Sequence, residues 1–211
     1  MEAKMVMKET EHESFWKGNF GDEYTDRNRC GEMMIACRVG NLAKCLSRAD
    51  YIHSSLEVGS NIGYNEIALQ KLYPTICMDV VEINEKAAKE CSLIQNVNVH
   101  NTSIYNFEAD KQYDLTFVNG VLIYIDSDKL EKVYEKLYSY SRKYILIIEY
   151  YNPVPVEVNY RGYNGQLCKR DFAGEMLEKY KDLELLDYGF IYHKDKAFPM
   201  DDFNWFLLLK K

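Results

Sequence analysis

The sequence predicts an α/β fold: a doubly wound, Rossmann-like sheet of parallel strands with helices on both faces and an antiparallel hairpin at its C-terminal end. Three observations predict it. Short, almost continuously apolar runs alternate with segments of helical spacing, which is typical of strands buried on both faces. A glycine-containing turn follows the first of these runs. The length of 211 residues suits one such domain.

The composition of residues 15–28 predicts an N-terminal arm outside the main domain. Residues 15–28 are rich in aromatic, glycine and charged side chains and lack a clean helical or strand period. We therefore expect residues 1–30 to form an ordered functional arm and residues 31–211 to form a single domain. From Glu32 to Ser47, apolar residues recur at intervals of three and four, which predicts an amphipathic helix.

Alternating strands and helices follow this helix. The strands are expected at Ser54–Val58, Ile76–Val81, Val97–His100, Tyr113–Val118 and Tyr144–Ile148. The helices between them are expected at Asn65–Leu72, Asn84–Glu90 and Asp128–Tyr140. Because helices connect consecutive strands, the strands are predicted to run parallel.

The C-terminal part of the chain departs from this alternation. Residues 152–170 contain two prolines and two glycines and predict a loop or an insertion. Residues Asp171–Lys179 have a helical pattern. The last two apolar runs, Leu185–His193 and Phe203–Leu209, flank a proline-containing turn, so we expect them to pair as an antiparallel hairpin at the edge of the sheet.

The charge and composition of the chain argue against several classes of binding partner. The net charge of -7 and the pI of about 5.2 argue against nucleic acid, since phosphate binding requires clustered Lys and Arg. No apolar run approaches the roughly 18 to 20 residues of a membrane span, and the N-terminus is polar, so we expect a cytoplasmic protein without membrane insertion. The six cysteines are scattered without metal-binding spacing, so no metal is expected. The oligomeric state is not predicted.

The strongest chemical signal is the segment 55–63, SLEVGSNIG, between a predicted strand and a predicted helix. In a doubly wound sheet the ligand lies beyond the carboxyl ends of the strands, and glycine at the strand exit allows close approach of the backbone. Gly59 and Gly63 meet this need, with Glu57 just before them. Asn61 replaces the middle glycine of the usual loop and tolerates a left-handed backbone.

An acidic residue at the end of the next strand indicates a nucleoside. Glu82 lies about two dozen residues after Gly59, where a carboxylate accepts both ribose hydroxyls of an adenosine. The spacing Gly59-x-x-x-Gly63 differs from the G-x-G-x-x-G loop that holds a pyrophosphate. The pattern therefore favours S-adenosylmethionine (SAM), with S-adenosylhomocysteine (SAH) as the product, over a nicotinamide dinucleotide. An ordinary strand-to-helix turn with two glycines is the alternative.

Residues after the third and fourth strands complete the expected cofactor site. Ser103 and Ile104 are placed to meet the edge and the face of the adenine. Asn119 and Gly120 are expected beneath the methionine and the sulfonium, where their backbone holds the amino group.

The arm is expected to fold over the cofactor. Trp16 and Tyr24 offer aromatic cover, and Arg27 offers a cation for the methionine carboxylate. Apolar packing of the arm against the sheet is the alternative.

Three stretches resemble the methylases associated with pseudaminic acid biosynthesis, which are class I SAM-dependent methyltransferases. Residues 15–28 (FWKGNFGDEYTDRN) are similar to the N-terminal signature of that family, and residues 59–63 (GSNIG) resemble its cofactor loop. Residues 152–162 and 169–175 are similar to its insertion after the fifth strand. The resemblance implies a methyl donor and an acceptor from bacterial surface-glycan biosynthesis. Tyr124 stands where a His is expected in such methyltransferases. If that His serves as the base elsewhere, it cannot do so here.

Methyl transfer from a sulfonium mainly requires alignment of the acceptor, but an oxygen or nitrogen acceptor must also lose a proton. Glu149, His193 and Asp171 are the candidate bases. A hairpin histidine without a catalytic role is the alternative for His193, and a structural carboxylate is the alternative for Glu149.

The predicted insertion carries a cluster of basic and aromatic residues in an otherwise acidic protein. Tyr160, Arg161, Lys169 and Arg170 suit a carboxylate or phosphate on the acceptor. They favour an anionic small molecule, such as a nonulosonic acid or a nucleotide-linked or phosphorylated sugar. The alternatives are a solvated loop face, a phosphoramidate-type capsule modification, another small metabolite, a protein side chain as the acceptor, and a non-catalytic cofactor-binding protein.

Overall fold

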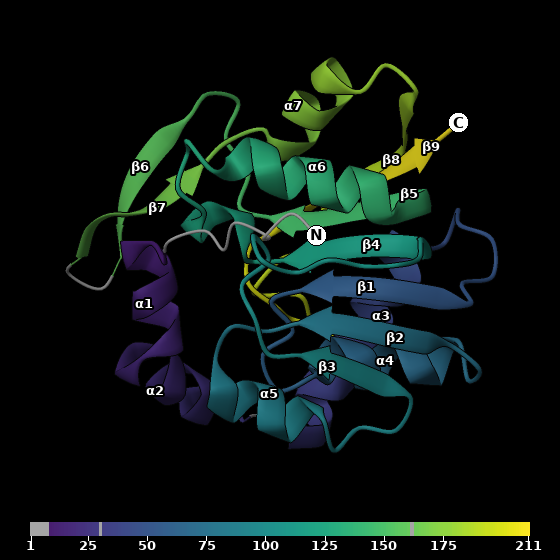
Figure 1. Cartoon of the computed structure of the whole chain (residues 1–211). Helices are drawn as coiled ribbons and strands as arrows, with labels where there is room; N and C mark the ends of the chain where they lie inside the picture. Colours follow the sequence, from purple (N-terminus) through teal and green to yellow (C-terminus); the bar gives the residue numbers. More distant parts are fainter. Residues whose placement is uncertain (1–8, 30, 161–162) are drawn as a thin grey trace, which may run out of the picture.

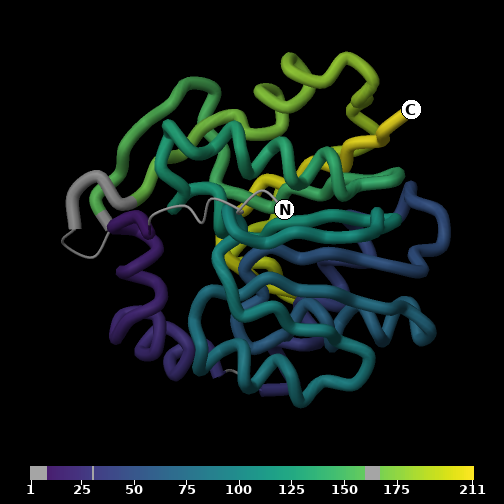
Figure 2. The backbone as a smooth tube through the Cα atoms, viewed as in Figure 1, coloured from purple at the N-terminus to yellow at the C-terminus, as the bar shows by residue number. Residues whose placement is uncertain are grey.

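A seven-stranded sheet forms the centre of the computed structural model, which describes residues 9–29, 31–160 and 163–211 (Figures 1 and 2). The strand order is β3-β2-β1-β4-β5-β9-β8. The strands are β1 (Ser54–Val58), β2 (Cys77–Val81), β3 (Val97–His100), β4 (Tyr113–Asn119), β5 (Ser141–Glu149), β8 (Leu183–Phe190) and β9 (Asn204–Lys210). Strands β1 to β5 pair in parallel, whereas β9 pairs antiparallel with both β5 and β8. The predicted fold class is confirmed.

Helices cover both faces of this sheet (Figure 1). They are α3 (Gly31–Cys45), α4 (Tyr64–Leu72), α5 (Glu85–Cys91), α6 (Leu130–Tyr140) and α7 (Phe172–Lys179). On one face, Leu42 of α3 and Leu69 of α4 pack with Phe117 of β4. On the other face, Val133 of α6 packs with Val118 of β4. Burial on both faces explains why the central strands are almost continuously apolar.

The N-terminal arm is helical, which corrects the expectation of a segment without a regular period. It folds as α1 (Glu11–Lys17) and α2 (Asn19–Arg27). The Thr10 side chain accepts from the Glu13 N–H, and the Glu13 side chain accepts from the Thr10 N–H, so a capping box starts the first helix. Gly18 has an extended backbone and separates the two helices.

The insertion after β5 is a two-stranded hairpin, where the sequence predicts a loop or an insertion. Strands β6 (Val156–Tyr160) and β7 (Tyr163–Lys169) pair antiparallel, with Val158 opposite Leu167. Strand β7 packs against η1 (Leu122–Tyr124), a 3-10 turn after β4 that the sequence does not predict. The hairpin therefore stands at the carboxyl end of β4, beside α1 in Figure 1. Among the helices described, none has the length and apolar character to cross a membrane.

Candidate functional site

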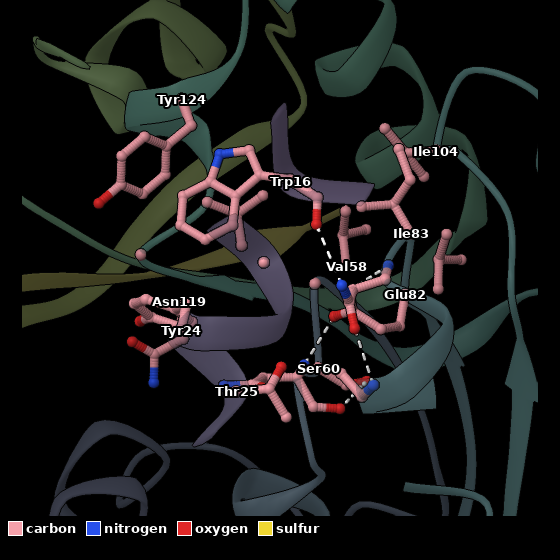
Figure 3. A pocket seen from close by; sticks show the side chains of 18 of the residues that line it. Trp16, Tyr24, Thr25, Val58, Ser60, Glu82, Ile83, Ile104, Asn119 and Tyr124 are labelled. Carbon is pink, nitrogen blue, oxygen red and sulfur yellow. Dashed lines mark hydrogen bonds between the residues drawn. The ribbon is translucent and has the colours of Figure 1, made fainter. Parts of the chain in front are cut away.

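A cavity lies at the carboxyl ends of β1, β2 and β4, beneath the helical arm (Figure 3). Its walls come from the turns that follow β1, β2, β3 and β4 and from α1, α2 and α3. Nine of the predicted cofactor residues line it: Trp16, Tyr24, Gly59, Asn61, Glu82, Ser103, Ile104, Asn119 and Gly120. The predicted residues Arg27, Glu57 and Gly63 are not among the lining residues. The topology thus gathers residues from five separate segments at one edge of the sheet.

The turn after β1 has the backbone that its residue types predict. Gly59, Asn61 and Gly63 have φ values of +78°, +49° and +86°, all in the left-handed region. A Cβ atom at Gly59 would lie 2.5 Å from Cγ2 of Val121, so no larger side chain fits there. Gly63 instead caps the start of α4, and a Cβ atom there would meet Ile94. Gly59 allows a ligand to approach the backbone closely. Gly63 instead allows the start of α4 to pack closely against Ile94.

Glu82 has a fixed position at the floor of the cavity. Its Oε2 atom accepts from the Asn61 N–H at 2.7 Å, and its Oε1 atom accepts from the Asn84 N–H at 2.8 Å. Burial raises the pKa of this carboxyl, and the backbone N–H groups act in the opposite direction. The two carboxylate oxygens are hydrogen-bond acceptors at the cavity wall, as recognition of ribose hydroxyls requires.

The arm is held across the cavity by polar and aromatic contacts. Asn84 Nδ2 donates to the Trp16 carbonyl at 3.3 Å, and Thr25 Oγ1 donates to Asn61 Oδ1 at 3.3 Å. The Trp16 ring meets the Tyr124 ring edge-on, with 4.7 Å between centroids. Figure 3 shows Trp16 between Tyr124 and Ile104, above the turn that carries Ser60. Trp16 and Tyr24 both line the cavity, as the proposed cover requires.

Among the residues that the structure describes, the arginine that lines the cavity is Arg38, and the geometry does not support the role predicted for Arg27. Arg27 is exposed, lies 3.5 Å from Glu23 on its own helix, and sits over the Phe20 ring. Arg38, on α3, lines the cavity and donates through Nη1 to Asn65 Oδ1 at 2.6 Å. Its Nε atom is buried and has no hydrogen-bond partner among the described residues. Arg38 is therefore the residue that could hold a carboxylate.

Glu57 lies below the cavity, where its carboxyl holds the side chain of Asn65. It is fully buried and accepts from Asn65 Nδ2. Burial and the neighbouring carboxyl of Glu66 raise the pKa of Glu57, and burial also raises the pKa of Glu66. Because Asn65 also accepts from Arg38, this network fixes the direction of the arginine.

The remaining walls are apolar with a few polar atoms. Ile104 and Ile83 line the side where the adenine was expected, and Ser103 Oγ accepts from the Tyr105 N–H at 3.1 Å. Asn119 and Gly120 line the side expected for the methionine, and Gly120 has a φ of +70°.

Other lining residues were not predicted from the sequence: His12, Thr25, Arg38, Asn65, Ile83 and Tyr105 among them. For His12, Arg38 and Asn65, the position in the cavity depends on how helices pack, which no local pattern of residue types indicates.

None of the three candidate bases lines the cavity. Glu149 is buried, and its Oε1 accepts from the N–H groups of Val121 and Leu122 at 2.7 Å each. Burial raises the pKa of Glu149 to about 8. Asp171 accepts from the Gly174 N–H as the N-cap of α7, and the exposed His193 pairs with Asp202. These contacts give each of the three a structural role and do not favour a base.

The predicted basic cluster is only partly brought together. Arg161 and the side chain of Tyr160 lie outside the described residues. Lys169 Nζ lies 4.7 Å from the centre of the Tyr150 ring. Arg170 donates through Nε to Glu175 Oε1 at 2.6 Å, and its Nη1 lies 3.5 Å from Ser127 Oγ. Lys169 and Arg170 do not line the cavity.

Solved structures share the fold of this chain. The plantazolicin methyltransferase BpumL, in complex with a pentazolic desmethylPZN analog and SAH, has a TM-score of 0.66 at 14% identity, covering 95% of this chain and 94% of that chain. The magnesium protoporphyrin IX methyltransferase ChlM from Synechocystis PCC 6803, with bound SAM, has a TM-score of 0.67 at 11% identity, covering 98% and 100%. The N-methyltransferase NodS from Bradyrhizobium japonicum WM9, with SAH, has a TM-score of 0.62 at 14% identity, covering 87% and 90%. The sequence matches no protein-family model and no curated protein.

The chain therefore has the fold of the class I SAM-dependent methyltransferases. The names of these three proteins refer to different molecules, so the shared fold does not define an acceptor.

Proposed function

We propose that this chain is a SAM-dependent methyltransferase that binds the donor in the cavity beneath the arm and releases SAH. One observation carries the proposal: the left-handed turn at Gly59 and the fixed carboxylate of Glu82 meet at the carboxyl ends of adjacent strands. This pairing provides close backbone approach and a ribose acceptor in one place. A relative of the fold that binds no cofactor has no need to keep this pair.

The residues that line the cavity can be assigned to the separate parts of the donor. Glu82 accepts the ribose hydroxyls, and Ile83 and Ile104 hold the two faces of the adenine. Arg38 binds the methionine carboxylate through the side of the guanidinium that includes its unpartnered Nε atom. The arm, with Trp16 above the cavity, excludes water and aligns the acceptor. When bound, the donor supplies an activated methyl group.

For the acceptor, we propose an anionic small molecule of bacterial surface-glycan biosynthesis, of the nonulosonic acid or nucleotide-linked sugar type. The sequence resemblance to the pseudaminic acid-associated methylases supports this class. So does the position of Lys169 and Arg170 at the base of a hairpin that packs against η1, next to the cavity. A phosphoramidate-type capsule precursor or another small metabolite is the second candidate.

Methyl transfer from radiolabelled SAM tests both parts of the proposal. The acceptors are N-acetylneuraminic acid, its CMP conjugate and UDP-N-acetylglucosamine, with the uncharged methyl ester of N-acetylneuraminic acid as the matched control. Labelled product from a charged acceptor and none from the ester supports an anionic acceptor. Equal labelling of acid and ester contradicts it. Absence of SAH binding in calorimetry contradicts the methyltransferase itself.

A further inference from the structure

The first helix of the arm brings a histidine to the cavity with a carboxylate beside it. His12, on α1, lines the cavity. Its Nδ1 atom lies 2.7 Å from Oδ1 of Asp126, which belongs to the segment between η1 and α6. The two atoms are within ion-pair distance, but the ring nitrogen does not have hydrogen-bond geometry toward any of the described residues. The histidine side chain is 16% exposed and the aspartate side chain is 30% exposed. Asp126 itself does not line the cavity, so it stands behind the imidazole.

This pair lies on the part of the cavity wall that the first helix of the arm provides. His12 is one turn before Trp16 on the same helix, and the Trp16 ring contacts Tyr124. Val121, Tyr124 and Ile125 line the cavity just after Asn119 and Gly120, the residues assigned to the methionine end of the donor. The imidazole and the expected position of the transferred methyl group therefore share one chamber.

The same end of the cavity connects to the hairpin proposed to bind the acceptor. Arg170 Nη1 lies 3.5 Å from Oγ of Ser127, the residue next to Asp126. Strand β7, which ends just before Arg170, packs against η1. An acceptor held by the base of the hairpin would thus reach the donor past His12.

We propose that His12 is the general base of the methyl transfer and that Asp126 is the positioning residue that orients it. This inference rests on the proposed function. A hydroxyl of the acceptor loses its proton to Nε2 of His12 while its oxygen forms a bond to the methyl carbon. The carbon–sulfur bond breaks, and its electron pair remains on sulfur, which becomes the thioether of SAH. The imidazolium later returns its proton to water.

The charged groups around the pair suit this role. Glu13 and Tyr105 also line the cavity, from α1 and from the segment after β3. Beyond Asp126, Asp128 and Lys129 pair with each other at 2.9 Å. Asp126 is the carboxylate within ion-pair distance of His12 when the imidazole holds the proton.

The first test needs no acceptor. Nitrogen-15 NMR of the SAH complex identifies the protonated ring nitrogen of His12, with His12→Asn used to assign the signals. We expect the neutral imidazole to carry its proton on Nδ1, toward Asp126, and to leave Nε2 free. A proton fixed on Nε2 in the neutral ring overturns the proposal, because that nitrogen could not then accept another.

The second test measures transfer from SAM to CMP-N-acetylneuraminic acid and the other acceptors named above. We expect His12→Asn to lower kcat by about 100-fold, to bind SAH within about twofold of wild type, and to lose the acid limb of the pH profile. His53→Asn, an exposed histidine outside the cavity, is the matched control and should behave as wild type. SAH binding with wild-type kcat in His12→Asn overturns the inference and leaves the proposed function standing. No SAH binding by the wild-type chain overturns the proposed function instead.

Discussion

Replacing Glu149 with Gln isolates one buried carboxyl and the pH dependence that it gives to folding. Glu149 is 2% exposed, and its Oε1 accepts from the N–H groups of Val121 and Leu122, just after Gly120. Its Oε2 has no hydrogen-bond partner among the described residues. A glutamine keeps the accepting oxygen and cannot ionise, so the variant preserves the turn while it removes the titration.

The magnitude follows from the shift in pKa. Burial raises the pKa of Glu149 to about 8 from an ordinary value of 4.5. The folded state therefore holds a proton that the unfolded state releases. The stabilisation is fully present below about pH 4.5 and is lost as the pH rises through about 8. Between pH 5 and pH 7 the wild-type chain should lose about 2 to 3 kcal/mol of folding free energy through this group.

Urea unfolding of both proteins at pH 5, 6, 7 and 8 measures the effect as a difference, which cancels the other titrating groups. We expect Glu149→Gln to gain about 2 to 3 kcal/mol relative to wild type from pH 5 to pH 7. Glu184→Gln removes an exposed carboxylate and should show no such trend. A pH-independent difference between Glu149→Gln and wild type would refute the assignment of a buried, protonated carboxyl.

Of three further predictions, two concern the binding of SAH and the third concerns the reaction with the acceptor. Gly59→Val should weaken SAH binding at least tenfold by calorimetry, because its φ of +78° and its contact with Val121 exclude a side chain; binding within twofold would contradict this. Arg38→Ala should weaken SAH binding about tenfold or more, whereas Arg27→Ala should leave it unchanged; the reverse order would restore the role first expected of Arg27. Arg170→Ala should lower kcat/KM for CMP-N-acetylneuraminic acid about tenfold without changing SAH affinity; an unchanged rate would remove the hairpin from the acceptor site.

The sheet and the turn after its first strand could be predicted because local patterns determine them. Residues Ser54–Val58 and Val97–His100 are strands with the expected bounds, since apolar runs between turn residues are a local signal. The left-handed backbone of Asn61 follows from its residue type and its place between two glycines. The position of Glu82 at the cavity could be predicted from its spacing after Gly59.

The arm and the insertion were predicted less well, although signals for both were present. The capping box of Thr10 and Glu13 indicates the first helix, and the spacing of four residues between Phe20 and Tyr24 suits the second. The aromatic content of the arm instead suggested an irregular cover. In the insertion, the alternation Val-x-Val at 156–158 was a strand signal outweighed by the neighbouring prolines.

The polar contacts of the cavity could not be read from the sequence. Arg38 lies inside an amphipathic helix whose pattern only says which face is buried, and its contact with Asn65 depends on how α3 meets α4. His12 and Asp126 are distant in the sequence and meet only because the arm folds back over the sheet. For Glu149, the position at the end of β5 could be predicted from the sequence, but the direction of its side chain could not. The carboxyl accepts from the backbone of the turn after β4 and does not face the cavity.

Calorimetric titration with SAH tests the central claim, that the cavity beneath the arm binds the methyl donor. The wild-type chain should bind SAH with micromolar affinity, and Glu82→Ala should bind at least about tenfold more weakly because the ribose hydroxyls lose their acceptor. Glu184→Gln, on the exposed surface, should bind as wild type does. Absence of binding by the wild-type chain, or equal affinity in a folded Glu82→Ala protein, would contradict the account.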